Sequence, residues 1–364
     1  MAPTAVSLPD IQINIPTKQF SVGQAAIHST LQPCTQTSTR TSPIPPLRAA
    51  LTSESTPLAI RFRALFSLKH HASLSPSDST TIPAIEAIAA AFPSPSALLK
   101  HELAYCLGQS GNLAAVPYLE GVLKDKGQDD MCRHEAGEAL GALGGSKSLP
   151  LLKEYASKKA GGESVPLVVK ETCEIAIARI EWMMSKEREK ERLRISDFAS
   201  VDPAPPTPQD LQREGETGIE ELKGQLMDTR SSLFERYRAM FALRDLASPP
   251  NLPTAVTAVN ALAKGFEDKS ALFRHEVAFV FGQLSHPASV PALEKVLGDL
   301  EEESMVRHEA AEALGSLGEE EGVEDFLKKH LNDKAEVVRD SVIVALDMAE
   351  YERSGQVEYA ALPE

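Results

Sequence analysis

The hydrophobic residues of this chain recur with the spacing of amphipathic helices. Between about residues 97 and 124, apolar side chains follow one another every three or four positions, first in one segment and then in a second. Pro117 and Pro291 stand where the second helix of such a pair would begin, a position that tolerates a missing N–H. Signals for β-hairpins are absent from the pattern. We therefore expect an all-α protein built from pairs of helices.

Glycines near the ends of the longer helical patterns suggest where those helices stop. They are Gly108, Gly144, Gly282 and Gly318. A left-handed C-cap favours a residue without a β-carbon, so these four glycines are expected to cap their helices.

Long segments of the two halves of the sequence match one another, which indicates a tandem duplication. The central segments are offset by 174 residues, and the flanking ones by slightly different numbers. The matching strings are ALLKHELAYCLGQ from Ala97 with ALFRHEVAFVFGQ from Ala271, MCRHEAGEALGALG from Met131 with MVRHEAAEALGSLG from Met305, RFRALFSL from Arg61 with RYRAMFAL from Arg236, and VVKETC from Val168 with VVRDSV from Val337. Each half holds four units spaced by roughly 32 to 39 residues, which is typical of two-helix solenoid repeats.

The predicted fold is an α-helical repeat solenoid with two pseudo-symmetric lobes of four helical hairpins each. KEREKERLR from Lys186 is compatible with an extension of the last helix of the first lobe, and DPAPPTPQD from Asp202 predicts a flexible or polyproline-like connector. The expected segments are a largely disordered Ser/Thr/Pro-rich extension (1–44), the N-terminal lobe (45–190), a linker (191–216), the C-terminal lobe (217–352) and a frayed tail (353–364).

Cysteine usage and charge restrict the compartment and the partners. Cys34, Cys106, Cys132 and Cys173 form no C-x-x-C pair, so we expect reduced thiols of an intracellular protein. No segment approaches the roughly 20 apolar residues of a membrane span, and the N-terminus lacks a secretory pattern. We expect a cytoplasmic protein, with the nucleus as a second location. A formal net charge of −15 disfavours nucleic acid and anionic lipid and favours cationic partners.

Four His-Glu dipeptides occupy matching positions in the duplicated repeats, two in each half and 33 residues apart. They are His101-Glu102, His134-Glu135, His275-Glu276 and His308-Glu309. A single such pair in a helical repeat is usually an exposed polar pair. The outer repeats show that the fold does not require histidine there, since their equivalent residues are Phe62, Glu171, Tyr237 and Asp340. Four pairs in register are therefore better explained by function.

The spacing of the pairs predicts a metal centre between the lobes. Equivalent residues of stacked repeats lie side by side at the roughly 8–10 Å of packed helices, so two pairs in one half can share an ion. Two-fold packing of the halves would bring two ions together. Imidazole and carboxylate ligands with open positions favour Fe(2+) over zinc or magnesium, although other metals stay open. Placement in the first helical turn would let both residues of a pair reach an ion, so the pairs are expected near helix N-termini.

Two familiar metal-site patterns do not fit. A zinc protease needs H-E-x-x-H, but the fourth residue after each histidine is Tyr105, Glu138, Phe279 or Glu312. Glu-x-x-His pairs on successive long helices, typical of ferritin-like di-iron bundles, are also missing. Tyr105 and Phe279 are expected to be core aromatics.

Other residues near the pairs have two readings each. Glu138 and Glu312, one turn after His134 and His308, either orient the imidazoles or lie on an exposed helix face. Met131 and Met305 either line a substrate channel or, by the stronger expectation, fill the core.

The strings KHELAYCLGQ, CRHEAGEALGALG, RHEVAFVFGQL and VRHEAAEALGSLG closely resemble the deoxyhypusine hydroxylases, which are HEAT-repeat di-iron monooxygenases. The resemblance covers roughly residues 45–190 and 217–352. It implies that the chain uses O2 to hydroxylate the deoxyhypusine side chain of the eukaryotic translation initiation factor that carries hypusine. It also implies two Fe(2+) ions per chain and an electron donor that the sequence does not identify. A carboxylate-rich cleft would attract the ammonium groups of such a substrate.

The resemblance further implies a role for each member of the four pairs. The first iron would be held by His101, His134 and Glu135, and the second by His275, His308 and Glu309. Glu102 and Glu276 match family glutamates with a catalytic role, which either bind metal or contact the substrate amine.

Two other functions compete with this hypothesis. A non-catalytic repeat scaffold would bind a protein partner and use the metal as a structural clip, and it would contain zinc rather than iron. A binuclear hydrolase would be active without any reductant.

Overall fold

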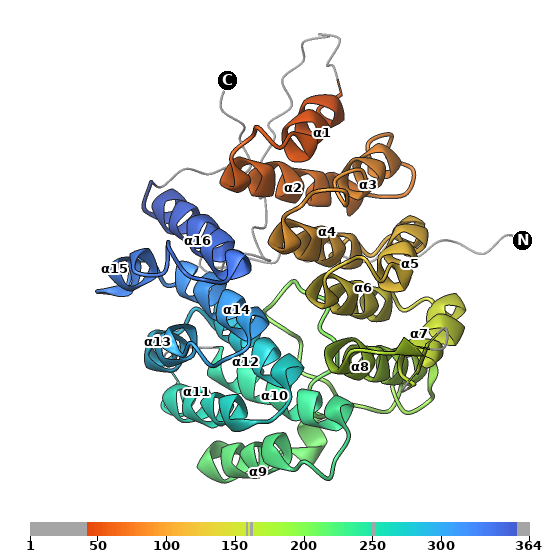
Figure 1. Ribbon diagram of the computed structural model, residues 1–364. Coiled ribbons are helices and arrows are strands. Elements are labelled where there is room, and N and C mark those ends of the chain that lie inside the picture. The colour runs from red at the N-terminus through yellow and green to blue at the C-terminus, as the bar shows by residue number, and fades with distance from the viewer. Residues whose placement is uncertain (1–41, 158, 161–162, 249–251, 355–364) are drawn as a thin grey trace, which may run out of the picture.

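The computed structural model describes residues 42–157, 159–160, 163–248 and 252–354. Within these ranges, sixteen α-helices follow one another along two rows of stacked helices (Figure 1). The first half contains α1 (Ile44–Thr52), α2 (Leu58–Ala72), α3 (Thr81–Ala89), α4 (Ala97–Gln109), α5 (Val116–Lys124), α6 (Asp130–Leu143), α7 (Leu149–Tyr155) and α8 (Leu167–Met184). The second half contains α9 (Gly215–Met227), α10 (Leu233–Ala247), α11 (Ala255–Ala263), α12 (Ala271–Leu284), α13 (Val290–Gly298), α14 (Ser304–Gly315), α15 (Val323–Lys328) and α16 (Glu336–Ser354). The all-α repeat fold predicted from the sequence is confirmed.

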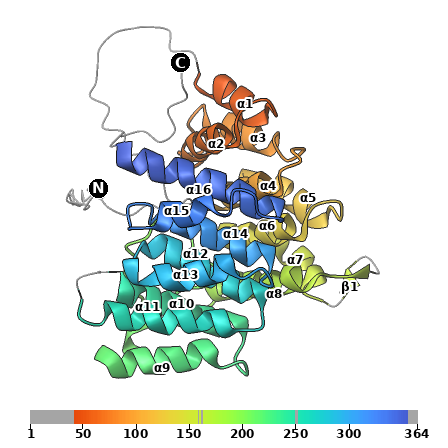
Figure 2. The ribbon, with the colours of Figure 1, turned by 60° about the vertical axis from the view of Figure 1, so that its left-hand side comes forward.

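The two halves lie side by side and run in opposite directions. Figures 1 and 2 show α1 and α9 at opposite ends of the molecule, with the second half returning along the first. The main contacts between the halves join α2 and α4 to α16, and α8 to α10 and α12. The even-numbered helices therefore form an inner layer between the halves, and the odd-numbered helices lie outside it.

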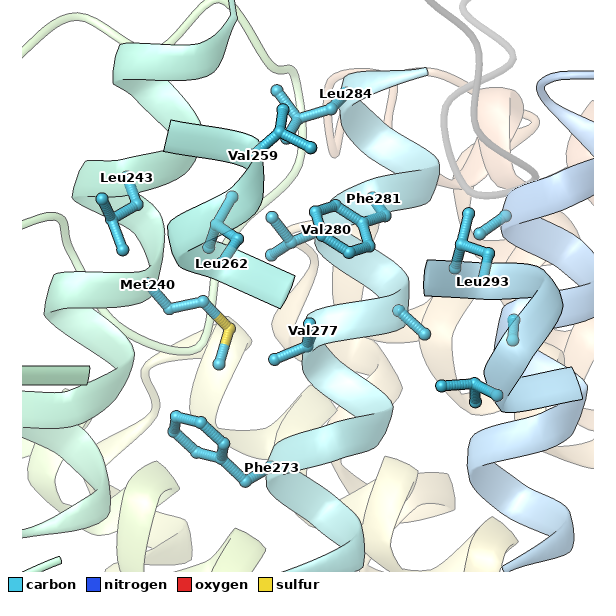
Figure 3. Close-up of a cluster of buried hydrophobic side chains, with 14 of the residues drawn as sticks. Met240, Leu243, Val259, Leu262, Phe273, Val277, Val280, Phe281, Leu284 and Leu293 are labelled. Atoms are coloured by element: carbon cyan, nitrogen blue, oxygen red, sulfur yellow. The ribbon is translucent and has the colours of Figure 1, made fainter. Parts of the chain in front are cut away.

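Each half has its own hydrophobic core, and each core takes in side chains from the other half. Figure 3 shows part of the second core, which includes Met240 of α10 and Phe273 and Phe281 of α12. Ile175 of α8 belongs to this second core, whereas Val344 of α16 belongs to the first. These two residues occupy equivalent positions in the duplication, so the last inner helix of each half is shared with the other.

Helix ends follow the sequence expectations only in part. Gly144 caps α6 in the left-handed conformation, with φ of 69°. Gly108 and Gly282 lie inside α4 and α12, and Gly318 has no positive φ. Gly108 instead permits close packing, since an added β-carbon would lie 2.7 Å from Cα of Ala139. The capping prediction for these three glycines was wrong, and at Gly108 the reason is that a close helix crossing also requires a residue without a side chain.

The connector between the halves is packed against both of them. α8 ends at Met184, and the segment from Lys186 forms turns rather than a helical extension. Phe198 and Ala204 are buried in the second core. Arg179 of α8 donates from Nε to the backbone oxygen of Asp202 at 2.7 Å. These contacts differ from the flexible connector that the Pro-rich composition predicts, because apolar and charged side chains within the segment find buried partners.

A short hairpin interrupts the helical pattern between α7 and α8. Strand β1 (Lys159–Ala160) pairs with β2 (Glu163–Ser164) in antiparallel register. The sequence expectation of no hairpin was therefore wrong, and the missed signal is the Gly161-Gly162 dipeptide between the strands.

The predicted terminal segments lie mostly outside the described residues. α1 begins at Ile44, a buried residue that belongs to the first core, and α16 ends at Ser354. The extension up to residue 41 and the tail from residue 355 are not described. Among the helices of the described ranges, none has the length and apolar character needed to cross a membrane.

Candidate metal centre

The four His-Glu pairs lie at the same place on four inner helices. Each histidine is the fifth residue of its helix and each glutamate the sixth, on α4, α6, α12 and α14. Side-chain caps fix the start of three of these helices: the caps are Ser96 on α4, Asp129 on α6 and Ser270 on α12. The pairs are close to helix N-termini, as expected. They lie in the second turn, however, and not in the first.

This position decides which residues meet. Consecutive residues in mid-helix point about 100° apart, so a histidine and the glutamate that follows it face different neighbours. Nε2 of His101 instead lies 3.3 Å from Oε2 of Glu135, which belongs to the next inner helix. In the second half, Nε2 of His275 lies 3.4 Å from Oε2 of Glu309. Imidazole and carboxylate are thus paired between repeats rather than within a dipeptide.

All eight side chains gather in one buried cluster. Their residues are between 0% and 6% exposed. The ring centroid of His101 lies 5.5 Å from that of His134, 5.7 Å from that of His275 and 5.2 Å from that of His308. The rings of His134 and His275 are 5.3 Å apart across the two halves. The solenoid halves therefore bring the four pairs together, as the spacing predicted.

Most potential metal-binding atoms of this cluster lack a hydrogen-bond partner among the described residues. There, both ring nitrogens of all four histidines are buried without a hydrogen bond, and so is one oxygen each of Glu102 and Glu276. A buried polar group without a partner costs about 1–3 kcal/mol, so such a concentration needs an explanation. Bound cations supply one, because neutral imidazole and carboxylate are metal ligands. The residues present fit a metal centre.

Two compact sets of donors each belong to a single half of the chain. In the first set, ligand atoms of His101, His134 and Glu135 all lie within 4.8 Å of one another. In the second, those of His308, Glu309 and Glu312 do so. A third set that meets the same criterion, His101 with His275 and His308, spans both halves. Neither Glu102 nor Glu276 belongs to any of these sets in the described structure.

In the metal-free cluster, burial and neighbouring charges shift the pKa values of the ionisable groups in different directions. Burial disfavours a charged imidazole at His101, but the carboxylates of Glu135, Glu102 and Glu309 together outweigh burial and raise the pKa of His101 to about 9. His134 has no such carboxylate, and burial followed by the charges of neighbouring imidazoles lowers its pKa well below the usual value. Burial raises the pKa of Glu102 to about 7 and that of Glu276 well above its usual range. Without a cation, the cluster therefore takes up protons to reduce its negative charge.

A pocket opens beside the cluster. Tyr105 belongs to the first core and Phe279 packs against it, so the expectation that they are core aromatics is confirmed. Both also line this pocket, with their ring centroids 6.0 Å apart. Glu102, Glu138 and Glu312 also line it. Of the two readings for Glu138 and Glu312, an exposed helix face is excluded. The pocket thus combines an aromatic wall with carboxylates.

Met131 and Met305, by contrast, are not among the residues that line the pocket. Met131 is buried, and Met305 packs against the second core. Core packing, the stronger of their two readings, fits these positions.

Residues of the outer repeats tie the two halves together at the site. Ser96, the cap of α4, donates from Oγ to Oδ2 of Asp340 on α16 at 3.0 Å. Ser270, the cap of α12, donates to Oε2 of Glu171 on α8 at 2.7 Å. Asp340 and Glu171 stand at the repeat position that the histidines occupy in the inner units. Sequence comparison identified their register but not their role, which depends on how the halves dock.

The connector crosses the other end of the same inner helices. Gln109 and Gln283 are equivalent residues near the C-terminal ends of α4 and α12. The Gln109 side chain donates to the backbone oxygen of Val201 at 3.2 Å and accepts from its N–H at 2.7 Å. The Gln283 amide donates to Oγ of Ser200 at 2.7 Å. The connector, which has no counterpart in the duplication, therefore covers this end of an otherwise two-fold arrangement.

Comparison with known proteins gives consistent relatives. The family described as HEAT repeats matches residues 82–163 and 259–347. A deoxyhypusine hydroxylase of Neurospora crassa is 66% identical over 318 residues, which are 87% of this chain and 96% of that protein. A deoxyhypusine hydroxylase of Phaeosphaeria nodorum is 65% identical over 321 residues, 88% of this chain and 95% of that protein. The structure of human deoxyhypusine hydroxylase in complex with glycerol is similar with a TM-score of 0.72 and 43% identity, covering 85% of this chain and 96% of that one.

Proposed function

Because the chain belongs to the deoxyhypusine hydroxylase family, we propose that it hydroxylates the deoxyhypusine side chain of the hypusine-bearing eukaryotic translation initiation factor. We propose O2 as the co-substrate and two iron ions per chain as the cofactor. The observation that carries this proposal is the cluster of four buried histidines whose ring nitrogens have no hydrogen-bond partner in the described part of the chain. The electron donor and the cytoplasmic or nuclear location stay predictions from the sequence.

Six of the eight side chains are proposed to hold the metal. His101, His134 and Glu135 would bind one iron, and His275, His308 and Glu309 the other. The contacts between successive inner helices support this division, since each carboxylate already faces the histidine of the preceding unit. Bound iron would supply the activation of O2, which amino acid side chains cannot perform. Burial of the cluster excludes bulk water from the reacting centre.

Glu102 and Glu276 are proposed to bind the substrate amine. Each has a buried oxygen without a partner, and neither joins the compact donor sets of the described residues. Glu102 also lines the pocket, as do His101, Glu135 and the aromatic pair. An aminoalkyl chain entering along Tyr105 and Phe279 would pack its methylene groups on the rings and place its ammonium group near these carboxylates. The position of the reacting carbon in the site would then be set by its distance from the ammonium group along the substrate chain.

Metal analysis combined with an assay for hypusine formation tests the proposal. Purified protein should contain about two irons and should hydroxylate the deoxyhypusine-containing factor only in the presence of O2 and a reductant. His134→Ala and His308→Ala should lose iron and activity while keeping their helical circular dichroism, because stacking with neighbouring repeats supplies most of the stability. His70→Ala, at an exposed histidine of α2, is the matched control and should keep both. Tightly bound zinc without hydroxylation would favour the scaffold, and turnover without a reductant would favour a hydrolase.

Replacing Glu102 or Glu276 by glutamine separates the two readings of these residues. If they bind the substrate amine, the variants keep two irons but lose substrate affinity, because an unpaired buried ammonium costs about 2–5 kcal/mol, or roughly 30-fold or more. Steady-state kinetics and metal content on the same preparation give both quantities. Loss of iron with an unchanged KM would instead identify the two glutamates as metal ligands.

A further inference from the structure

Equivalent residues next to the metal centre differ between the two halves. Glu138 on α6 and Glu312 on α14 both follow the second histidine of their half by one turn. On the adjoining inner helices, Thr172 of α8 matches Ser341 of α16 in the duplication. Thr172 and Ser341 are 1% and 0% exposed, so both hydroxyl groups need partners inside the protein.

In the second half, a hydroxyl group, a carboxylate and an imidazole form a chain of contacts in space. Ser341 donates from Oγ to Oε1 of Glu312 at 3.1 Å. The same oxygen of Glu312 lies 3.6 Å from Nδ1 of His308, which is an ion-pair distance rather than a hydrogen bond. Metal-binding histidines commonly donate their second ring N–H to a carboxylate, which fixes the tautomer and the ring orientation. Ser341 thus holds Glu312 where it can orient His308.

In the first half, the equivalent residues do not form this chain of contacts. Among the described residues, Oγ1 of Thr172 is buried without a hydrogen-bond partner. Its methyl group turns toward Gly137, where an added β-carbon would lie 3.5 Å from Cγ2 of Thr172. Within the described ranges, no hydrogen bond or ion pair joins Glu138 to His134. The carboxylate of Glu138 instead lines the pocket, and within the same ranges no hydroxyl group of α8 donates to it.

We propose that Glu312 and Ser341 are positioning residues for His308 and that the second-half metal position therefore binds its ion more tightly than the first. This inference rests on the proposed function, because it assumes one ion in each half. Loss of a carboxylate that orients a metal-binding histidine typically lowers metal affinity 10- to 100-fold. We expect a difference of at least about tenfold between the two positions. The first-half position, with Glu138 free to face the pocket, would be the one filled last and emptied first.

Titration with Co²⁺ in single-site variants tests the proposal, with affinity read from the visible absorption of the bound ion. His134→Ala leaves the second-half position and His308→Ala the first-half position. The dissociation constant should be at least about tenfold lower in the His134→Ala protein. Adding Ser341→Ala to His134→Ala should weaken Co²⁺ binding by about tenfold, whereas adding it to His308→Ala should change nothing. Thr172→Ala is the matched control and should change neither background.

Three results would overturn the inference. They are equal affinities of the two positions, equal effects of Ser341→Ala and Thr172→Ala, and an effect of Ser341→Ala on the first-half position. Thermal melting of the metal-free variants shows whether each is folded. If Ser341→Ala does not fold, Glu312→Gln in the His134→Ala background replaces it and should weaken binding 10- to 100-fold. A changed absorption band shape in Glu312→Gln would mean that Glu312 is itself a ligand, which also contradicts the positioning role.

The wild-type protein separates this inference from the function on which it rests. If the protein hydroxylates its substrate and binds two ions with equal affinity, only the proposed difference in affinity between the two metal positions is rejected. Protein that binds no iron and forms no hypusine rejects both proposals.

Discussion

Replacing Arg244 by methionine should destabilise the protein by removing the cation that holds the connector in place. Arg244 of α10 is completely buried. Its guanidinium donates to Oδ1 of Asp202 at 2.9 Å, to Oδ1 of Asp245 at 2.9 Å and to Oε1 of Gln283 at 2.8 Å. Asp202 belongs to the connector, and Gln283 lies at the end of α12. One side chain thus joins the connector, α10 and α12.

Aromatic rings enclose the same guanidinium. Its central carbon lies 4.3 Å from the ring centroid of Phe198 on the connector and 4.8 Å from that of Phe241 on α10. Methionine keeps an apolar chain between the two rings but supplies no donor. The variant therefore tests the charge and hydrogen bonds more than the packing.

The expected loss in the free energy of unfolding follows from the two carboxylates that would lose their partner. The side chains of Asp202 and Asp245 are 11% and 4% exposed. Removing one partner of a buried ion pair costs about 3–5 kcal/mol, because a charge is left buried without compensation. We expect a loss of this size in the free energy of unfolding at pH 8.

The loss should shrink at lower pH because Asp245 can become neutral. Burial, opposed by the charge of Arg244, raises the pKa of Asp245 from 3.8 to about 6. A raised carboxyl pKa in the folded state means that folded protein holds this proton more tightly than unfolded protein does. Its contribution to stability is thus present at low pH and is lost as the pH rises through about 6. Without Arg244 this pKa rises further, so Arg244→Met should cost less at pH 5 than at pH 8.

Urea unfolding at pH 5 and pH 8, followed by circular dichroism, measures both effects. Lys153→Met is the control, since the ion pair of Lys153 with Glu181 at 2.8 Å joins two exposed side chains. It should cost less than about 1 kcal/mol, as surface substitutions usually do. Limited proteolysis should also cut the connector of Arg244→Met faster than that of the wild type. A loss below about 1 kcal/mol at pH 8, or an equal loss at both pH values, would refute the reasoning.

Two further predictions concern helix packing and metal binding. Gly141→Ala should lose about 1–3 kcal/mol of stability because its β-carbon would lie 2.9 Å from Cα of Ala176, whereas Gly121→Ala, with open space in α5, should gain about 0.5–1 kcal/mol. Equal melting temperatures of these two variants would contradict this account of the α6–α8 contact. Iron(II) at about 100 times its dissociation constant should stabilise the wild-type protein by about 2.7 kcal/mol per bound ion under anaerobic conditions. A melting temperature that does not respond to iron would argue against ligation by the buried cluster.

The duplication allowed much of this arrangement to be predicted from the sequence. Two copies of one pattern fix the register of each repeat, so the helices that carry His101 and His275 could be placed before their contacts were known. The clustering of the four pairs follows from the stacking of repeats. The cross-repeat contact of His101 with Glu135 could not be anticipated from a dipeptide, because it depends on where the caps Ser96 and Asp129 start their helices.

Features that break the symmetry were the ones that sequence comparison missed. The connector exists only once, so no internal repeat shows that Phe198 is buried or that Asp202 meets a buried arginine. Composition indicated a flexible segment there because Pro-rich stretches rarely form a core. Partners distant in the sequence decide whether this segment is ordered, and Arg244, which binds Asp202, lies 42 residues further along the chain.

The differences between the halves are small in sequence but lie where they can matter for an unsymmetrical substrate. A perfect two-fold site would bind an aminoalkyl chain equally well in two opposite directions. Tyr105 and Phe279 are equivalent residues in contact in the pocket lining, so one of the two rings carries a hydroxyl group that the other lacks. The connector adds Asp202, whose charge raises the pKa of Glu276 after burial and the charge of Glu138. Each difference favours one direction of entry over the other. Removing them in turn, beginning with Tyr105→Phe, should therefore lower substrate affinity before it changes iron content.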